Sequence, residues 1–255
     1  MSPQTPWWLG TLSPFDLEST GVDTREARIV TGYVSTVLSR AQGRRQSIGA
    51  SVIINPGVPI PEGASKVHGI TDEVAQAKGC APVDGVYSIA KAVADSLNAR
   101  IPVVGFNVTY DLALLYWECL RHGIPTVAEQ MGLPPAAAVG PIVDALVLDK
   151  HFDQFRRGSR KLVDVAIHYG VPLVKAHTAD ADAVAAVRVA VAVAEKYAGD
   201  PELPTDPVAL HQLQKLWKVD QAKSLQRHLN TKGGKPDAYV DPCFPLCTDL
   251  THPTG

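Results

Sequence analysis

Cysteine is scarce in this chain, and the signals that mark secreted or membrane-spanning proteins are missing as well. The four cysteines among 255 residues are too few and too scattered for a disulfide framework, which suits a reducing cytoplasm. The opening segment MSPQTPWWLG has no basic region followed by an apolar run, so we expect no signal peptide. Every stretch of about 18 residues is interrupted by charge or proline, so we expect no membrane span. These absences predict a soluble, cytoplasmic protein with no membrane partner.

An excess of charge of one sign is also lacking. The formal net charge is −2, so the chain has no overall basic field of the kind that marks proteins coating duplex nucleic acid. A protein that grips only the last few nucleotides of a strand needs just a local groove, so this class stays open. Apolar residues make up 45% of the chain, enough for a substantial core in one domain with an appendage.

Strand and helix patterns alternate along the chain and predict an α/β domain. Strands are expected at residues 11–17, 28–39, 46–54, 101–106 and 141–148, where apolar and β-branched residues dominate. Helical periodicity is found at residues 82–99, 109–122, 161–169 and 179–197. Residues 56–79 are expected to form a loop with one short helix. This order predicts a mixed five-stranded sheet flanked by helices.

A segment rich in proline and acidic residues, 199–207, predicts a boundary. Residues 9–198 would form the main domain, and residues 199–255 a C-terminal extension. Within the extension, residues 208–229 have the pattern of an amphipathic helix, and the remainder is expected to be irregular. We expect the helix and the tail to pack on the domain.

Two carboxylates lie on the first predicted strand. Asp16 and Glu18 are two residues apart, so both project from one face, while Phe15 and Leu17 point the other way into the core. Adjacent carboxylates repel each other unless a cation lies between them, and hard oxygen ligands suit magnesium or manganese. Taken alone, the pair also fits an exposed acidic strand end.

A third acid, Asp111, follows a strand and a predicted N-cap, Asn107, so it falls in the first turn of a helix. An acid that complements the helix dipole is an equally good interpretation of this segment. His177 and Asp182 would lie about 140° apart on one continuous helix. To face a common site, His177 must precede the helix, with Thr178 as its cap. A surface histidine beside a first-turn acid is the alternative.

The combination of these segments resembles the DEDDh branch of the DEDD exonuclease superfamily, which has a ribonuclease H-like fold. The motifs are Phe-Asp-Leu-Glu-Ser-Thr-Gly at 15–21, Gly-Phe-Asn-(x3)-Asp at 105–111 and His-(x4)-Asp-Ala at 177–183. The resemblance covers about residues 11–198, so it identifies residues 9–198 as the exonuclease domain. Val-His-Gly-Ile-Thr at 67–71 and Val-Asp-Ala-Leu at 143–146 are similar to segments of the epsilon-type proofreading members. Ser19 replaces the commoner threonine, and Tyr110 the commoner phenylalanine.

This resemblance implies a metal-dependent 3′→5′ exonuclease that releases nucleoside 5′-monophosphates. Asp16, Glu18, Asp111 and Asp182 would hold two Mg²⁺ ions, for which Mn²⁺ can substitute. His177 would act as the general base that takes a proton from the attacking water.

Four further residues are candidates for gripping the terminal nucleotide: Thr20, His68, Phe106 and Asn107. Asn107 is equally well explained as a helix cap, and His68 as a residue that packs a loop. The basic residues between 156 and 161 would either follow the phosphate backbone or form a solvated loop.

The substrate and the partners are left open by the sequence. The loop at residues 68–70 favours DNA, and with it a role in DNA replication or repair, whereas RNA trimming or an oligoribonuclease-like activity is the alternative. A silent nucleic-acid-binding or assembly module is a third hypothesis. Expected partners are single-stranded 3′ ends of DNA or RNA, with a DNA polymerase or a sliding clamp as further candidates. Residues 212–217 faintly resemble a clamp-binding peptide, although their helical pattern favours packing on the core.

Overall fold

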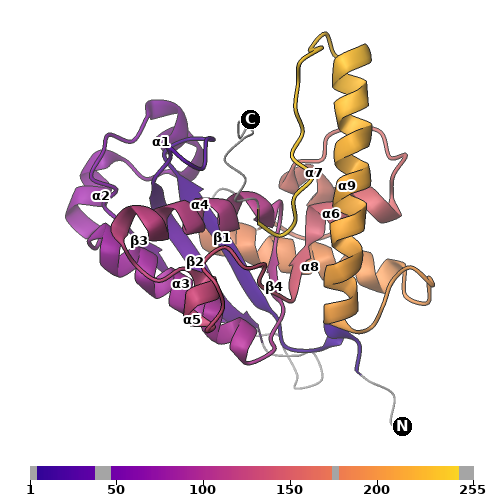
Figure 1. The fold of residues 1–255 in the computed structure, drawn as a ribbon, viewed down its shortest axis with the longest axis horizontal. Coiled ribbons are helices and arrows are strands. Elements are labelled where there is room, and N and C mark those ends of the chain that lie inside the picture. The colour runs from indigo at the N-terminus through magenta and orange to yellow at the C-terminus, as the bar shows by residue number, and fades with distance from the viewer. Residues whose placement is uncertain (1–4, 38–46, 174–177, 247–255) are drawn as a thin grey trace.

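A five-stranded mixed sheet forms the centre of the protein (Figure 1). The computed structural model describes residues 5–37, 47–173 and 178–246. The strands are β1 (Ser13–Ser19), β2 (Ile29–Val37), β3 (Ser47–Ile53), β4 (Val103–Gly105) and β5 (Ile142–Asp144), in the order β3-β2-β1-β4-β5. β1 and β2 pair antiparallel, as do β2 and β3, whereas β1–β4 and β4–β5 are parallel. The mixed sheet predicted from the sequence is confirmed.

Helices cover both faces of this sheet. α3 (Pro82–Asn98) and α4 (Val108–His122) lie on one face, and α8 (Ala179–Lys196) lies on the other. The smaller helices are η1 (Trp7–Leu9), α1 (Glu62–His68), α2 (Asp72–Lys78), α5 (Val127–Gln130), α6 (Ala145–Phe152) and α7 (Leu162–His168). The long α9 (Pro207–Thr231) follows α8. In the part of the chain that the structure describes, no helix is both long and apolar enough to span a bilayer.

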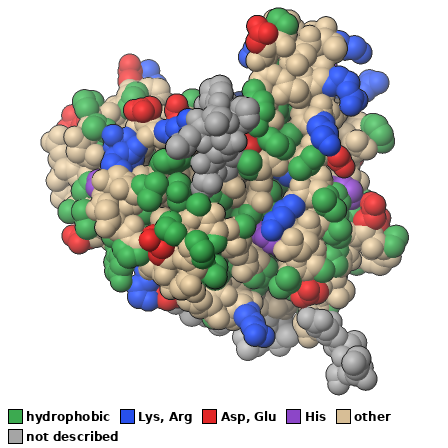
Figure 2. Space-filling view, viewed as in Figure 1, with side chains coloured by type: hydrophobic (Ala, Val, Ile, Leu, Met, Phe, Trp, Pro, Cys, Tyr) green, Lys and Arg blue, Asp and Glu red, His purple; other side chains and the backbone are tan. Residues whose placement is uncertain are grey.

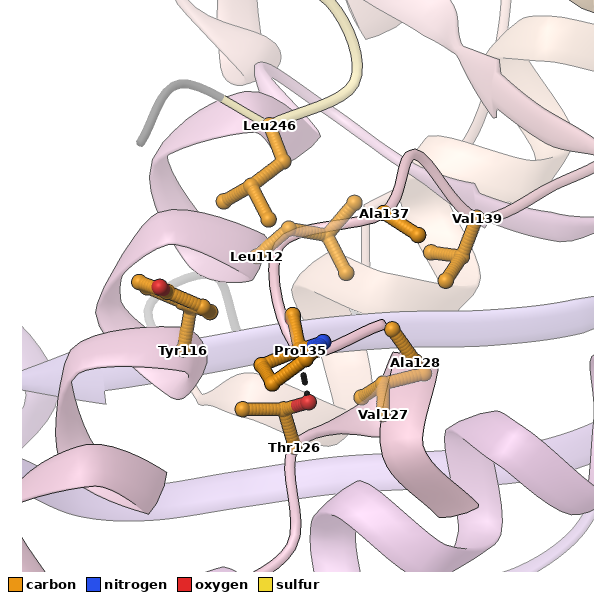
Figure 3. Close-up of a pocket in the computed structure, with 9 residues that line it drawn as sticks. All are labelled: Leu112, Tyr116, Thr126, Val127, Ala128, Pro135, Ala137, Val139 and Leu246. Carbon is orange, nitrogen blue, oxygen red and sulfur yellow. Dashed lines mark hydrogen bonds between the residues drawn. The ribbon is translucent and has the colours of Figure 1, made fainter. Parts of the chain in front are cut away.

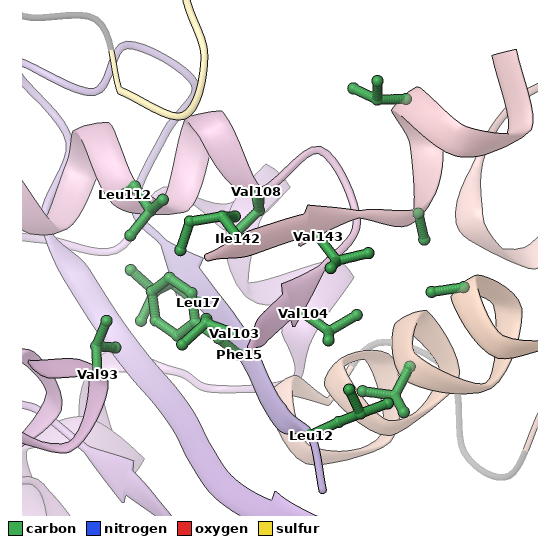
Figure 4. Packing of buried hydrophobic residues seen from close by; sticks show 14 of the residues in the cluster. Leu12, Phe15, Leu17, Val93, Val103, Val104, Val108, Leu112, Ile142 and Val143 are labelled. Atoms are coloured by element: carbon green, nitrogen blue, oxygen red, sulfur yellow. The ribbon is translucent and has the colours of Figure 1, made fainter. Parts of the chain in front are cut away.

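The core lies between β1 and the helices, and the alternation along β1 determines which side chains enter it. Phe15 is 0% exposed and Leu17 is 5% exposed. Both point to the side of the sheet where Val93 of α3 and Leu112 of α4 lie (Figure 4). The intervening side chains are therefore directed to the opposite face, as the two-residue period of a strand requires.

Residues 56–79 differ from the prediction because they form two helices. α1 ends at Gly69, whose φ of 75° lies in the left-handed region that glycine adopts readily. α2 begins immediately afterwards, where the Thr71 side chain accepts a hydrogen bond from the Val74 N–H at 3.4 Å. Both helices are short and largely exposed, so they lack the long apolar repeat by which helices are recognised in a sequence.

The strand expected at residues 141–148 is less than half as long as predicted, with three residues, Ile142–Asp144. It ends at Asp144, whose carboxylate accepts hydrogen bonds from the N–H groups of Leu146 at 2.9 Å and Val147 at 3.4 Å. This capping starts α6 at Ala145. The apolar residues that suggested a continuing strand are instead the buried face of a helix.

α9 packs along β5, the edge strand of the sheet, and supplies the partners that a further strand would supply. The Ile142 N–H donates to Nδ1 of His211 at 3.2 Å. Gln214 accepts from the Asp144 N–H at 2.8 Å and donates to the Ile142 carbonyl at 2.9 Å. Together with the buried Trp217, these contacts place residues 212–217 in a packed helix. The packing interpretation is confirmed, and the comparison with an extended clamp-binding peptide is wrong.

The segment after α9 returns to the domain. Leu246 lies over Leu112 and Tyr116 of α4, where it closes a small apolar pocket (Figure 3). This pocket has a volume of about 20 Å³, room for about one water molecule and far too little for a nucleotide. The substrate site must therefore lie elsewhere.

Candidate active site

The first two acids lie on β1, on the face opposite the core residues. Asp16 and Glu18 are half-buried, in contrast to the fully buried Phe15 and Leu17 beside them. This arrangement confirms the alternation predicted for the strand. Because α8 packs against β1, the two carboxylates are enclosed between the sheet and this helix.

The third acid, Asp111, lies in the first turn of α4 and is 4% exposed. Its Oδ1 accepts a hydrogen bond from the Leu17 N–H at 3.1 Å. Because Leu17 stands between Asp16 and Glu18 in β1, this bond fixes Asp111 directly beside the pair.

The fourth acid, Asp182, lies in the first turn of α8. Its backbone N–H donates to the Thr178 carbonyl at 2.9 Å. Thr178 occupies the N-cap position of α8, as predicted, although its side chain makes no capping hydrogen bond to the helix. His177 lies outside the described residues, and its role stays a prediction.

The acids from β1, α4 and α8 act on one another electrostatically. Burial raises the pKa of Asp16 well above its usual range, and repulsion from Asp111, Glu18 and Asp182 raises it further. Burial and then Asp182 raise the pKa of Glu18 to about 7. Burial also raises the pKa of Asp111, although the Leu17 N–H opposes this shift. The structure thus brings the four predicted acids into one cluster.

The donor set of this cluster fits a hard divalent cation, because all four side chains offer carboxylate oxygens. Within the described ranges, no three His, Cys, Asp or Glu side chains already stand at the positions of a metal site. Like charges that raise one another's pKa are held apart by repulsion unless a cation offsets it. The four acids therefore offer the donor atoms of a metal centre, but in this structure they do not lie at the positions of metal ligands.

The start of α4 is organised by Asp144 rather than by Asn107. The Asp144 carboxylate accepts hydrogen bonds from the N–H groups of Asn107 at 2.9 Å and Val108 at 3.1 Å. Asn107 has a φ of 60° and makes no side-chain cap, so its interpretation as a capping side chain is wrong. The Asn107 side chain is exposed and makes no capping hydrogen bond, so it stays a candidate for contact with substrate.

The other candidates for nucleotide binding lie around the same cluster. Thr20 follows β1, and its hydroxyl accepts from the Arg28 N–H at 2.9 Å. Phe106 is half-buried and packs against the core just before Asn107. His68 is 5% exposed, and burial lowers its pKa while the backbone of Ser19 opposes the shift. Contact of these residues with a nucleotide stays a prediction.

Ser19 and Tyr110 depart from the family motif, and nothing else in the sequence marks them. In the structure they hold the end of β1 in place. The two hydroxyl groups are 2.7 Å apart. Both donate to the Gly21 carbonyl, the Ser19 bond being 2.7 Å long. Because Tyr110 immediately precedes Asp111, this contact ties the start of α4 to the strand that carries the first two acids.

Of the basic residues between 156 and 161, Arg156 and Arg160 have a structural role, whereas Arg157 and Lys161 are exposed. Arg156 and Arg160 both bind the fully buried carboxylate of Asp149, at 2.9 and 2.7 Å. Neither a phosphate track nor a solvated loop describes these two arginines, because their charges are already matched inside the protein.

Comparisons with known proteins agree with this site. Residues 14–190 match the model of the RNase T family, described as an exonuclease, and no curated protein sequence matches the chain. Escherichia coli exonuclease I in complex with a dT13 oligonucleotide has a TM-score of 0.57 at 18% identity, covering 74% of this chain and 42% of that one. Exonuclease I from Methylocaldum szegediense has a TM-score of 0.58 at 19% identity, covering 86% and 45%.

A further exonuclease I structure has a TM-score of 0.61 at 18% identity, covering 84% of this chain and 47% of that one. The chain thus spans less than half the length of these structures, and at such identities the likeness concerns the fold. The family match supports a stronger conclusion, because it extends over more than half of the chain and includes all four acids of the cluster. The chain therefore belongs to the RNase T family of exonucleases.

Proposed function

We propose that this protein is a divalent-metal-dependent 3′→5′ exonuclease that releases nucleoside 5′-monophosphates from the ends of nucleic acid strands. The observation that supports this most strongly is the mutual effect of Asp16, Glu18, Asp111 and Asp182 on their pKa values. Burying acids together opposes folding unless a bound cation compensates. A cluster assembled from β1, α4 and α8 at this cost is better explained by catalysis than by stability.

The roles of the residues follow from their positions. Mg²⁺ or Mn²⁺ bound at the cluster would supply a water of lowered pKa and offset the charge at the scissile phosphate. Asp111 would bind a cation through Oδ2, because its Oδ1 is engaged by the Leu17 N–H. His177 would accept a proton from the attacking water, a task for which a neutral imidazole near pH 7 is suited.

We propose single-stranded DNA as the preferred substrate, in the context of DNA replication or repair, with RNA as the alternative. An exonuclease I of the same fold was solved with bound dT13 oligonucleotide, and another in complex with the C-terminal segment of SSB. The His68-Gly69-Ile70 segment at the end of α1 lies against Ser19, one residue from Glu18. This position beside the acid cluster supports the proposal that the segment binds the terminal nucleotide.

The test compares neutral variants of the acids. Asp16→Asn and Asp182→Asn should each abolish Mg²⁺-dependent degradation of 5′-labelled single-stranded DNA. Asp180→Asn is the matched control, since Asp180 lies on the same turn of α8 but is exposed. Full activity in either cluster variant would exclude the proposed mechanism. Parallel digestion of RNA and of duplex DNA with a mismatched end would identify the substrate.

The hypothesis of a silent binding module predicts a different result. Calorimetric titration of the wild-type protein with Mn²⁺ should show binding that Asp16→Asn removes. A silent module should show no site tighter than about 1 mM, a weak affinity by the standards of specific recognition.

A further inference from the structure

A groove runs beside α9 and ends at the start of α4. It has a volume of about 640 Å³, within the size range of ligand sites. One wall is α9, and the facing wall is the segment 235–241 that follows it. Its charged residues are Lys150, Lys218, Lys235, Asp237 and Asp241.

The groove lies next to the acid cluster. Asn107 lines the groove and is one helical turn ahead of Asp111 in the same segment. Along α9, the lining extends from Lys218 to Leu229, about 16 Å at the rise of an α-helix. A stacked strand rises about 3.4 Å per nucleotide, so the groove is long enough to lie alongside four or five nucleotides.

The groove is lined by three lysines and two aspartates, so positive charge exceeds negative charge by one. Burial lowers the pKa of the Lys150 ammonium, and the nearby charges of Lys218 and Arg160 lower it further, against the opposing effects of Asp144 and Asp149. Neither Lys150 nor Lys218 forms an ion pair with a side chain in the described part of the chain.

Of the two acids that act electrostatically on Lys150, Asp144 also interacts with Lys218, and Asp149 is shared with two arginines. The Asp144 carboxylate accepts hydrogen bonds from backbone N–H groups of α4 and α6, and the Asp149 carboxylate binds Arg156 and Arg160. On the facing segment, Asp241 accepts a hydrogen bond from the Cys243 N–H at 2.8 Å, which commits it to a turn. An external anion would therefore be the natural partner of Lys150 and Lys218.

The remaining lining suits nucleobases. Tyr239 is 38% exposed and Leu225 is 42% exposed, on opposite walls of the groove. Aromatic rings stack on bases of any sequence, which is how single strands are held without base-specific contacts. Lys and Arg side chains also gather over the protruding end of α9 (Figure 2), a distribution that favours an approaching polyanion.

We propose that this groove binds the single strand on the 5′ side of the nucleotide being removed, with Lys150, Lys218 and Lys235 contacting its phosphates. The proposal rests on the proposed function, because it assigns the direction in which the substrate leaves the acid cluster. It also gives the C-terminal extension, which lies outside the matched exonuclease region, a role in substrate binding.

The test measures binding without turnover. Fluorescence anisotropy of labelled dT12 and rU12 is recorded in chelator over a range of salt concentrations, with the full chain. The test variant is Lys218→Gln with Lys235→Gln. The matched control is Lys223→Gln with Lys232→Gln, two exposed lysines in or just after α9 that do not line the groove.

Each phosphate contact on a single strand contributes about 0.7 to the magnitude of the slope of log affinity against log salt. The double variant of the groove should therefore have a slope smaller in magnitude by about 1.4. The control should lose much less. A smaller salt slope with either dT12 or rU12 supports binding in the groove. The oligonucleotide that binds more tightly shows whether DNA or RNA is the preferred strand. An equal loss in both double variants, or none, would overturn the inference. If the wild-type protein degrades dT12 with Mg²⁺ while the groove variant binds dT12 normally, only this inference fails. If the wild-type protein binds dT12 through the groove but does not degrade it with Mg²⁺, the proposed function fails.

Discussion

At the scale of single residues, Glu18 shows how the site opposes the stability of the fold. Its carboxyl has a pKa of about 7 in the folded protein because of burial and the proximity of Asp182. In an unfolded chain a glutamate has a pKa of about 4.3. The folded state therefore binds more protons than the unfolded state in the interval between these values, and stability is lost as pH rises through about 7.

Replacement of Glu18 by Gln should remove this loss. In chelator, Glu18→Gln should be only slightly more stable than wild type at pH 5, which lies just above the unfolded pKa, and clearly more stable at pH 8. We expect a gain of about 1–2 kcal/mol, after allowance for solvent screening of a partly exposed group. Urea unfolding at the two pH values measures the difference. Asp180→Asn, which changes an exposed acid, serves as the control, and an equal gain at pH 5 and pH 8 for Glu18→Gln would contradict the prediction.

Asp144 connects catalysis with stability, because one carboxylate caps both α4 and α6. Asp144→Asn keeps the size of the side chain but replaces an acceptor oxygen by a donor facing N–H groups. We expect a loss of about 1–3 kcal/mol in unfolding free energy. Turnover should fall as well, because Asp111 lies one turn beyond the disturbed helix start. A variant that loses stability but keeps full turnover at low temperature would show that α4 is positioned by other contacts.

At the scale of elements, the pairing of α9 with β5 is the contact on which the C-terminal extension depends. Gln214 is fully buried and satisfies a donor and an acceptor of the strand. His211 accepts from the remaining outward N–H, and burial lowers its pKa to about 4, which keeps the ring neutral and able to accept. Three polar groups of the edge strand are therefore matched by side chains of a helix.

Gln214→Met should leave the Asp144 N–H and the Ile142 carbonyl without partners. Each buried unpaired group costs about 1–3 kcal/mol, so we expect a total loss of about 2–4 kcal/mol. For a chain of this size, this loss corresponds to a fall in Tm of about 2–4 °C per kcal/mol. Gln212→Met, on an exposed position of α9, is the control. Equal melting temperatures for Gln214→Met and wild type would show that the hydrogen bonds contribute nothing net.

The sequence predicts the elements whose pattern is local. β1, α3, α4 and α8 were identified within a few residues because their apolar positions repeat at the period of a strand or helix. The end of β5 could not be predicted, since Asp144 stops it while also binding the N–H groups of Asn107 and Val108. This long-range contact leaves no local signal.

The candidate site likewise contains residues that the sequence predicts and a groove that it does not. The four acids were predicted from motifs that resemble a family, and the structure gathers them at one place. The groove could not be predicted, because Lys150 and Lys218 come from separate helices whose packing is decided by α9 and β5. His177 lies outside the described residues and stays a prediction.

At the scale of the whole molecule, we expect the acid cluster to make stability depend on divalent cations. A cation that binds only the folded state adds about 2.7 kcal/mol when its concentration is 100 times its Kd. Because the raised pKa values of Asp16 and Glu18 let protons compete with the cation, the effect should grow as pH rises.

Thermal melts with Mn²⁺ and with chelator should therefore differ more at pH 8 than at pH 6. Asp16→Asn should show little difference at either pH, whereas Asp180→Asn should behave as wild type does. A metal-induced rise in Tm that is the same in Asp16→Asn would place the cation away from the cluster.

The way α9 covers β5 also bears on how copies of this protein can associate. Side chains of α9 occupy the outward N–H and C=O positions of β5 that an incoming strand would need. The sheet is therefore closed to extension at this edge, and its other boundary is β3. Among the sheet edges that the structure describes, strand addition, whether by a second copy or during aggregation of partly unfolded chains, is therefore directed to β3.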